Sequence, residues 1–318
     1  MANRRKRLHI AVGVILDQAT EKVLVARRPA HLHQGGLLEF PGGKVKPAEP
    51  VREALDRELW EELNIGVVNA RPLIQINHDY ESESVRLDVW LVTRWHGVPS
   101  GAEGQEIKWI GKDRLSAADF PAADRAIITA INLPPVYGIT PDWPVYGDEL
   151  FSRLLDRLDS GLRLLQFRSK VMDEPEKYET VKKIFAACNT RGCRLLLNGL
   201  PAGDVIEYIH GLHLPSDILL SLDKRPLDKN YLVAASCHNR QEIEHACRID
   251  ADFAVLSPVK QTSSHIAAQP LGWSGFSALV TDCNIPVYAL GGMQESDTDR
   301  ARTCGGQGIA MLSGIWGS

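Results

Sequence analysis

The sequence predicts two domains, an α+β domain with a mixed sheet and packed helices, followed by a compact (β/α)₈ barrel. Its 318 residues suit two domains, since one domain holds roughly 150 residues. A proline-rich stretch, NLPPVYGITPDWPVYGDE at 132–149, separates two different patterns. Before it, strand-like runs predominate and few helices are expected, whereas after it short apolar strands alternate with helical segments.

The first domain, residues 1–131, begins with two apolar, β-branched runs at 8–16 and 22–28, which the polar stretch DQATE separates. Such a pair predicts a β-hairpin. Further strands are expected at 85–95 and 106–110, and helices at 49–63 and 122–131. Strands with two packed helices make an α+β domain.

We place the linker at 132–135 and the second domain at 136–318, because the segment after the paired prolines is itself strand-like. Eight apolar segments follow one another there: VYGIT, LRLLQF, RLLLN, GLHLP, LVAAS, DFAVLS, IPVYAL and QGIAML. Eight strand–helix units of about 23 residues each correspond to a small (β/α)₈ barrel.

Composition excludes several classes of protein. With 44% apolar and 24% charged residues, the chain is typical of globular proteins, and no apolar run approaches the roughly 18 residues of a membrane span. The N-terminus lacks the apolar region of a secretory signal. A net charge of −4 gives no basic excess for stable nucleic-acid binding. The six cysteines include no C-x-x-C pair, so we expect reduced thiols in a cytoplasmic protein.

The most informative segment is the predicted helix at 49–63. Apolar residues at 51, 55, 59 and 63 form one stripe for packing against the sheet. Beside that stripe, Glu58, Glu61 and Glu62 share a sector of about 100°. Three adjacent carboxylates repel one another, and a hard divalent cation that also binds substrate phosphates removes the repulsion. On these residues alone, a solvated acidic face is the alternative. Arg57 precedes Glu61 by four residues and can hold its carboxylate in place.

The full spacing favours metal binding. Residues 43–62, GKVKPAEPVREALDRELWEE, reproduce the pattern G-x5-E-x7-R-E-U-x-E-E of the Nudix box, and the chain resembles the Nudix family in this motif. Over residues 7–131 it is similar to MutT-like members, in LHIAVGVI, ARRPAHLHQGGLLEFPGGK and WLVTRWHG. One position departs, since Asn64 replaces the usual glycine. That position ends the helix with a positive φ, which Asn tolerates best after Gly.

The resemblance implies hydrolysis of a nucleoside triphosphate, preferentially 8-oxo-dGTP, to the monophosphate and pyrophosphate. Water attacks phosphorus while Mg²⁺ or Mn²⁺ neutralises charge on the phosphate oxygens. The implied metal ligands are the Gly43 carbonyl, Glu58, Glu61, Glu62 and Glu103. The implied catalytic residues are Arg57, Glu58, Glu61 and Glu103, and the implied nucleotide contacts are Arg28, His33, Glu39, Phe40, Tyr80 and Asp124.

Base preference rests on a position where the chain departs from MutT-like proteins. Their FPxAN segment places an amide against the O6 and N7–H of oxidised guanine, whereas this chain has FPAAD, so Asp124 stands there. An ionised carboxylate accepts from N7–H and needs a proton before it can donate to O6. The resemblance therefore implies the triphosphate chemistry more directly than the base.

Residues 134–316 resemble the thiamine-phosphate synthase/TenI family, in LLQFRSK, ASCHN, ADFAVLSPVKQTSSH and IPVYALGGM among other segments. The Q-x-R-x-K run at 166–170 leaves one strand end and should point into the barrel mouth, where it binds an anion. A Gly-Gly pair at 291–292 lets backbone N–H groups approach a phosphate. The predicted ligand site comprises Gln166, Arg168, Lys170, Asn198, His238, Gly291 and Gly292.

Metal-dependent synthase activity is not expected of the barrel. The family places an Asp after the Asn of the third strand and another in H-L-G-Q-x-D, but here Gly199 follows Asn198, and Asp217 of HLPSDI is one position out of place. Without these ligands, Mg²⁺ cannot carry a pyrophosphate leaving group. HLP resembles TenI-type members instead, some of which tautomerise a thiazole phosphate without metal. We therefore expect a thiazole- or pyrimidine-phosphate ligand, with His238 as the proton-transfer residue.

Two alternatives stay open. The Nudix site could act on thiamine-pathway diphosphates, because the second domain resembles proteins of that pathway. The barrel could instead be a non-catalytic phosphate-binding or dimerising module, and a homodimer is compatible with either reading.

Overall fold

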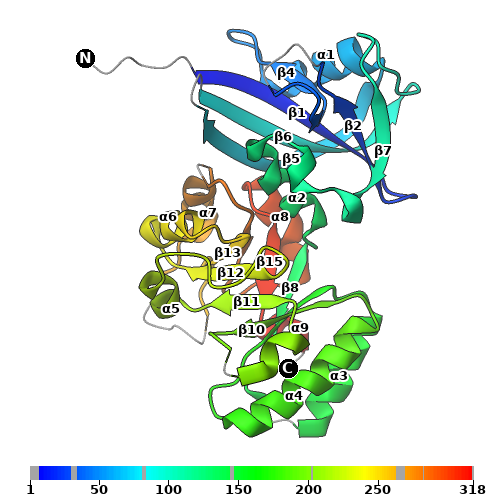
Figure 1. Cartoon of the computed structure of the whole chain (residues 1–318). Helices are drawn as coiled ribbons and strands as arrows, with labels where there is room; N and C mark the ends of the chain where they lie inside the picture. Colours follow the sequence, from blue (N-terminus) through cyan, green and yellow to red (C-terminus); the bar gives the residue numbers. More distant parts are fainter. Residues whose placement is uncertain are drawn as a thin grey trace. The chain divides into compact units, whose positions relative to one another are not determined.

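The computed structural model describes residues 7–29, 34–80, 84–143, 147–201, 203–262, 269–281 and 283–316. The chain divides into two compact units, Met1–Asn132 and Leu133–Ser318 (Figure 1). Within the described ranges, no helix combines the length and the apolar character that crossing a bilayer requires.

The N-terminal unit contains a mixed, seven-stranded sheet. Its strands are β1 (Arg7–Asp17), β2 (Lys22–Arg27), β3 (Leu38–Glu39), β4 (Gly42–Lys44), β5 (Gly66–Asp79), β6 (Ser84–His96) and β7 (Ile107–Gly111). The order is β3-β2-β1-β6-β5, with β4 added to β1 and β7 to β2. Only β1 and β6 are parallel among these pairs. The predicted β1–β2 hairpin is confirmed, with Ile15 opposite Leu24.

Two helices cover the two faces of this sheet, α1 (Val51–Leu63) and α2 (Arg125–Asn132). Alternation along β1 directs Ala11 and Ile15 toward the α1 side and Val12 and Val14 toward the α2 side. Three short 3₁₀ turns precede α2, at Lys112–Arg114, Ala117–Asp119 and Ala122–Asp124. The last of these turns occupies the first three residues of the helix predicted at 122–131.

The longest strand of the sheet, β5, is absent from the prediction. It spans 14 residues, GVVNARPLIQINHD, and its pairing with β6 shifts register at three places, one of them beside Pro72. Proline and bulges disturb the alternation by which strands are recognised, and edge strands tolerate both. β5 lies at one edge of the sheet, so Pro72 and the register shifts are compatible with its being a strand.

The C-terminal unit is a closed barrel of eight parallel strands. They are β8 (Val136–Ile139), β9 (Leu164–Phe167), β10 (Arg194–Asn198), β11 (Gly211–Leu214), β12 (Leu232–Cys237), β13 (Phe253–Leu256), β14 (Val287–Ala289) and β15 (Gly308–Met311). Seven of the eight predicted segments contain one of these strands, and β12 extends one residue beyond the remaining segment, LVAAS. β15 pairs with β8 to close the barrel.

Helices surround the barrel: α3 (Gly147–Asp159), α4 (Glu174–Asn189), α5 (Ser216–Ser221), α6 (Arg240–Arg248), α7 (Gly272–Val280), α8 (Thr298–Thr303) and α9 (Ser313–Trp316), with 3₁₀ turns at Gly203–Tyr208 and Glu295–Asp297. Tyr137, Phe253 and Tyr288 fill the interior, with ring centroids 5.4 to 5.8 Å apart. All six cysteines are free thiols. Because these rings fill the interior, a site is expected toward the carboxyl ends of the strands.

Candidate active site

Helix α1 presents its acidic side chains beside the glycine strand β4. Leu55, Leu59 and Leu63 of the predicted apolar stripe are buried against the sheet together with Ala54, while Val51 is only partly buried. Strand β4 pairs with β1. At the end of α1, Asn64 adopts φ 56° and ψ 33°, and its N–H donates to the Trp60 carbonyl at 3.1 Å. The left-handed position predicted for Asn64 is therefore confirmed.

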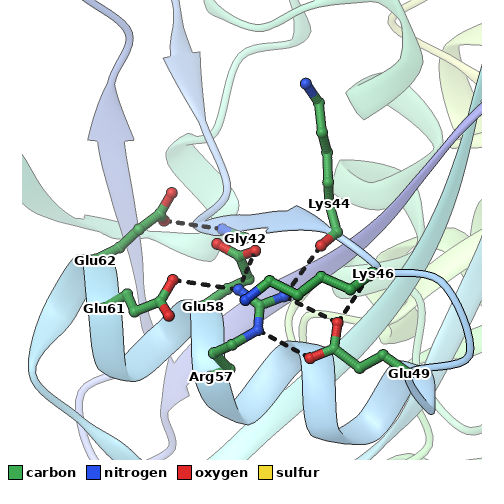
Figure 2. Close-up of polar contacts among 8 residues, drawn as sticks. All are labelled: Gly42, Lys44, Lys46, Glu49, Arg57, Glu58, Glu61 and Glu62. Carbon is green, nitrogen blue, oxygen red and sulfur yellow. Dashed lines mark hydrogen bonds and ion pairs between the residues drawn. The ribbon is translucent and has the colours of Figure 1, made fainter.

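Arg57 connects the acidic residues of this site (Figure 2). Its Nε and Nη2 donate to the two oxygens of Glu49 at 2.9 and 3.0 Å, and Nη1 donates to Glu58 Oε1 at 2.6 Å and Glu61 Oε2 at 3.2 Å. Nη2 also donates to the Lys44 carbonyl at 3.1 Å. These hydrogen bonds lower the pKa of Glu49 to about 2. One guanidinium thus fixes three carboxylates and the backbone of β4.

The two glycines of β4 lie in close contact with their neighbours. A β-carbon at Gly43 would lie 2.3 Å from Cδ of Glu58, and one at Gly42, where φ is +149°, would lie 2.1 Å from the Ala11 carbonyl oxygen. Both distances are far below van der Waals contact. Glycine at position 43 therefore lets the Glu58 carboxylate rest directly against the backbone.

Glu62 is crowded by like charges. The Gly42 N–H donates to its Oε2 at 3.0 Å, but burial raises the pKa of Glu62 to about 8, and the carboxylates of Glu39, Glu103 and Glu58 raise it as well. Desolvated carboxylates that face one another favour the protonated form unless a cation is present.

The loop that carries Glu103 is attached to the end of α1. The Ala102 N–H and Gln105 Nε2 both donate to the Glu62 carbonyl, at 2.9 and 2.8 Å. Glu103 itself is exposed. This attachment is why a residue 41 positions beyond Glu62 in the sequence acts electrostatically on that carboxylate.

The donor set has the chemistry of a hard-cation site. In the part of the chain that the structure describes, no three His, Cys, Asp or Glu side chains converge closely enough to hold a metal as they stand. Arg57 engages Glu58 and Glu61, and the Gly42 N–H engages Glu62. All the donors are nevertheless oxygens. The raised pKa of Glu62 reflects its burial and, to a smaller extent, repulsion from neighbouring carboxylates, and a bound Mg²⁺ or Mn²⁺ would favour the ionised carboxylate against both.

Three of the predicted nucleotide contacts interact electrostatically. They are Arg28, directly after β2, Glu39 in β3 and Asp124 in the 3₁₀ turn before α2. Arg28 forms an ion pair with Glu39. Asp124 is only 8% exposed. Burial and the charge of Glu39 raise the pKa of Asp124 to about 7, against the opposing effect of Arg28. Asp124 is thus a buried carboxyl group that exchanges its proton near neutral pH.

Two other predicted contacts, Phe40 and Tyr80, pack in or against one hydrophobic cluster. Phe40 stacks on Phe120 with ring centroids 5.1 Å apart. Tyr80 makes an edge contact with His78 at 4.3 Å and packs against the cluster that contains Phe40. His33 lies outside the described residues.

A cavity of about 400 Å³ is present at the carboxyl ends of the barrel strands. Six of the seven residues predicted for the barrel site line it: Gln166, Arg168, Lys170, Asn198, Gly291 and Gly292. No carboxylate occurs among the described lining residues. The buried Nε of Arg168 has no hydrogen-bond partner within the described structure. Two cations without an acid favour an anionic ligand.

His238, the seventh predicted residue, is not among those that line the cavity. Its side chain is 44% exposed, and its Nδ1 lies 2.9 Å from Glu242 Oε2. Gly199, with φ +94°, and Asp217, in the first turn of α5, are also absent from the lining. The lining instead includes His213 and Ser236, which the sequence analysis did not single out. Alternation along GLHLP, with the leucines directed outward, could have placed His213 inside.

Both parts of the chain match known families. Residues 136–315 match the family model TMP-TENI, described as thiamine monophosphate synthase, and residues 11–130 match a NUDIX domain model. The chain belongs to both families, and its N-terminal domain is a Nudix pyrophosphohydrolase.

Individual relatives agree with this division. The 8-oxo-dGTP diphosphatase of Escherichia coli (strain K12) is 37% identical over 126 residues, which cover 40% of this chain and 97% of that protein. The CTP pyrophosphohydrolase of the same organism is 35% identical over 117 residues, 35% of this chain and 87% of the relative. A protein provisionally named thiamine-phosphate synthase 2 in Aquifex aeolicus is 32% identical over 183 residues, 58% of this chain and 98% of the relative.

Proposed function

We propose that the Nudix domain hydrolyses purine nucleoside triphosphates, 8-oxo-dGTP before dGTP, to the monophosphate and pyrophosphate. The observation that carries this proposal is the group of carboxylates that α1 presents beside Gly42 and Gly43, ordered by Arg57. Hydrolysis of 8-oxo-dGTP would remove an oxidised nucleotide before its incorporation into DNA.

Glu58, Glu61, Glu62 and Glu103, with the Gly43 carbonyl, would hold Mg²⁺, or Mn²⁺ in its place. Such a cation neutralises charge on the phosphate oxygens and lowers the pKa of bound water. Arg57 restricts the rotamers of Glu58 and Glu61, so that less entropy is lost when substrate binds. Glu103, held near α1 by its loop, is the residue that would orient the attacking water or accept its proton.

Asp124 supports the choice of base. A protonated carboxyl group can donate to O6 of 8-oxoguanine and accept from N7–H at the same time, as an amide does. Burial gives Asp124 a pKa of about 7, so this form is populated at neutral pH. With dGTP, N7 carries no hydrogen, and one of the two hydrogen bonds is lost.

A substrate panel tests the proposal. We expect kcat/KM with Mg²⁺ to rank 8-oxo-dGTP above dGTP, and both above CTP and thiamine diphosphate, with monophosphate and pyrophosphate as the nucleotide products. The highest value for thiamine diphosphate would instead support the second candidate function, hydrolysis of thiamine-pathway diphosphates, which the fused barrel favours. The highest value for CTP would contradict purine recognition.

For the barrel we propose a site for a small phosphate ester, such as a thiazole or pyrimidine phosphate, without synthase activity. Support comes from Arg168 and Lys170 in a cavity whose described lining holds no carboxylate. The full-length protein should bind 4-methyl-5-(2-phosphoethyl)thiazole in a calorimeter. It should form no thiamine phosphate from that compound and the pyrimidine diphosphate at any Mg²⁺ concentration. Steady product formation would restore the synthase function.

A further inference from the structure

A chain of hydrogen bonds runs beneath the barrel cavity. Asn198 Nδ2 donates to Gln166 Oε1 at 3.2 Å, and Gln166 Nε2 donates to Tyr137 Oη at 3.3 Å. Tyr137 Oη lies 3.1 Å from His213 Nδ1, and His213 Nε2 lies 2.7 Å from Ser236 Oγ. The three central members are buried, with exposures of 3% for Gln166, 0% for Tyr137 and 2% for His213.

The number of hydrogens that each group carries determines which group donates in each of these hydrogen bonds. Because Gln166 donates to Tyr137 Oη, the single phenolic proton has His213 Nδ1 as its acceptor. A neutral imidazole carries one N–H, so with Nδ1 accepting, the hydrogen resides on Nε2 and is donated to Ser236 Oγ. The Ser236 oxygen then accepts a hydrogen bond from His213 Nε2. Its own O–H can therefore donate to a ligand in the cavity, which Ser236 lines.

His213 is in the charge state that this direction requires. Burial lowers the pKa of its imidazole to about 3, and the charge of Arg168 lowers it as well. The ring is therefore neutral throughout the ordinary pH range, and only one of its nitrogens can donate.

We infer that Tyr137 and His213 are positioning residues that fix the Ser236 hydroxyl as a hydrogen-bond donor toward the ligand of the barrel. The ligand class follows from the cavity. Arg168 selects an anion, the apolar walls formed by Ile139, Leu290, Met293, Met311 and Leu312 suit a small ring, and Ser236 requires an acceptor lone pair. A phosphorylated heteroaromatic compound with an unprotonated ring nitrogen meets all three conditions, whereas a donor at that atom would face a second donor. This inference rests on the proposed anion site of the barrel.

The hydrogen bonds that run from Tyr137 through His213 to Ser236 form a relay, and the direction of donation along it can be tested without any ligand. In ¹⁵N NMR spectra of the full-length protein, His213, assigned by loss of its signals in His213→Gln or by their shift in Ser236→Ala, should be the Nε2–H tautomer. Tyr137→Phe removes the donor to Nδ1, so the ring should move toward the Nδ1–H tautomer. An Nδ1–H tautomer in the wild-type protein, or no change in Tyr137→Phe, would overturn the relay.

Calorimetry tests the consequence for binding. Ser236→Ala and Tyr137→Phe should each weaken binding of 4-methyl-5-(2-phosphoethyl)thiazole by about threefold to tenfold, and leave inorganic phosphate binding unchanged. The double variant should bind no more weakly than Ser236→Ala, because Tyr137 acts through Ser236. Additive losses, or equal losses for inorganic phosphate, would overturn the inference. If neither probe binds the wild-type protein, the proposed anion site fails, while the tautomer still decides the relay.

Discussion

Replacement of Asp124 by Asn tests how the nucleobase is read. The pKa of this carboxyl group rises from 3.8 to about 7 on folding, and about three pKa units correspond to about 4 kcal/mol in favour of the protonated form. Above pH 7 the ionised group can no longer donate to O6. A buried acceptor left unpaired costs about 1–3 kcal/mol, and 1.4 kcal/mol is about tenfold in kcat/KM.

The sign of the pH effect follows from the same shift. A raised folded-state pKa contributes stability below pH 3.8 that is lost as pH rises through about 7. Asp124→Asn has no such loss. As pH rises from acid to mildly alkaline, the free energy of unfolding of the variant minus that of the wild type should therefore increase by up to about 4 kcal/mol. Chemical denaturation at several pH values measures this difference.

The kinetic assay compares kcat/KM for 8-oxo-dGTP in the variant and the wild type at each pH, because the ratio cancels the titration of the metal site. The ratio should be near one well below pH 7 and rise about tenfold above it. Asp119→Asn, an equal charge change at an exposed residue of the preceding 3₁₀ turn, should give a constant ratio. A flat ratio for Asp124→Asn would refute base reading by this residue.

Two further substitutions probe the acidic site. Gly43→Ala places a β-carbon on the Glu58 carboxyl group, so kcat should fall at least about tenfold with little change in Tm, and a kcat equal to wild type would show that this contact is dispensable. Arg57→Lys keeps the charge and loses the forked contact with Glu49; kcat should fall about tenfold. The lowered pKa of Glu49 gives stability that is present above its ordinary 4.5 and lost toward about 2. Acid unfolding of Arg57→Lys, followed by circular dichroism, should therefore begin at higher pH than in the wild type, and an unchanged profile would count against the Arg57–Glu49 contact.

Much of the fold was predictable because its signals are local. Each barrel strand is a short apolar run between polar segments, and the β1–β2 hairpin has β-branched runs on both sides of a polar turn. β5 escaped prediction because its irregular pairing with β6 replaces the alternation that marks a strand, and sequence does not reveal that a segment lies at a sheet edge.

In the candidate sites too, features that depend on one element were predictable, whereas features that depend on contacts between distant segments were not. Helical spacing predicts that Glu58, Glu61 and Glu62 share a sector, because it depends on one element alone. The raised pKa of Asp124 depends on Glu39, and the role of Glu103 depends on how its loop is attached to α1. Such long-range contacts are visible only in the folded chain. His213 lay in a correctly predicted strand, and its inward direction could have been derived from alternation.

The central claim, that the carboxylates of α1 hold a divalent cation for triphosphate hydrolysis, is tested most directly by Glu58→Gln. Turnover of 8-oxo-dGTP at saturating Mg²⁺ would be compared with that of Glu53→Gln, the same change at an exposed position of the same helix. We predict that Glu58→Gln lowers kcat by about 100-fold or more, with Tm preserved, and that Glu53→Gln retains full activity and releases monophosphate and pyrophosphate. Wild-type kcat in Glu58→Gln would contradict the account and leave the acidic sector as a solvated helix face.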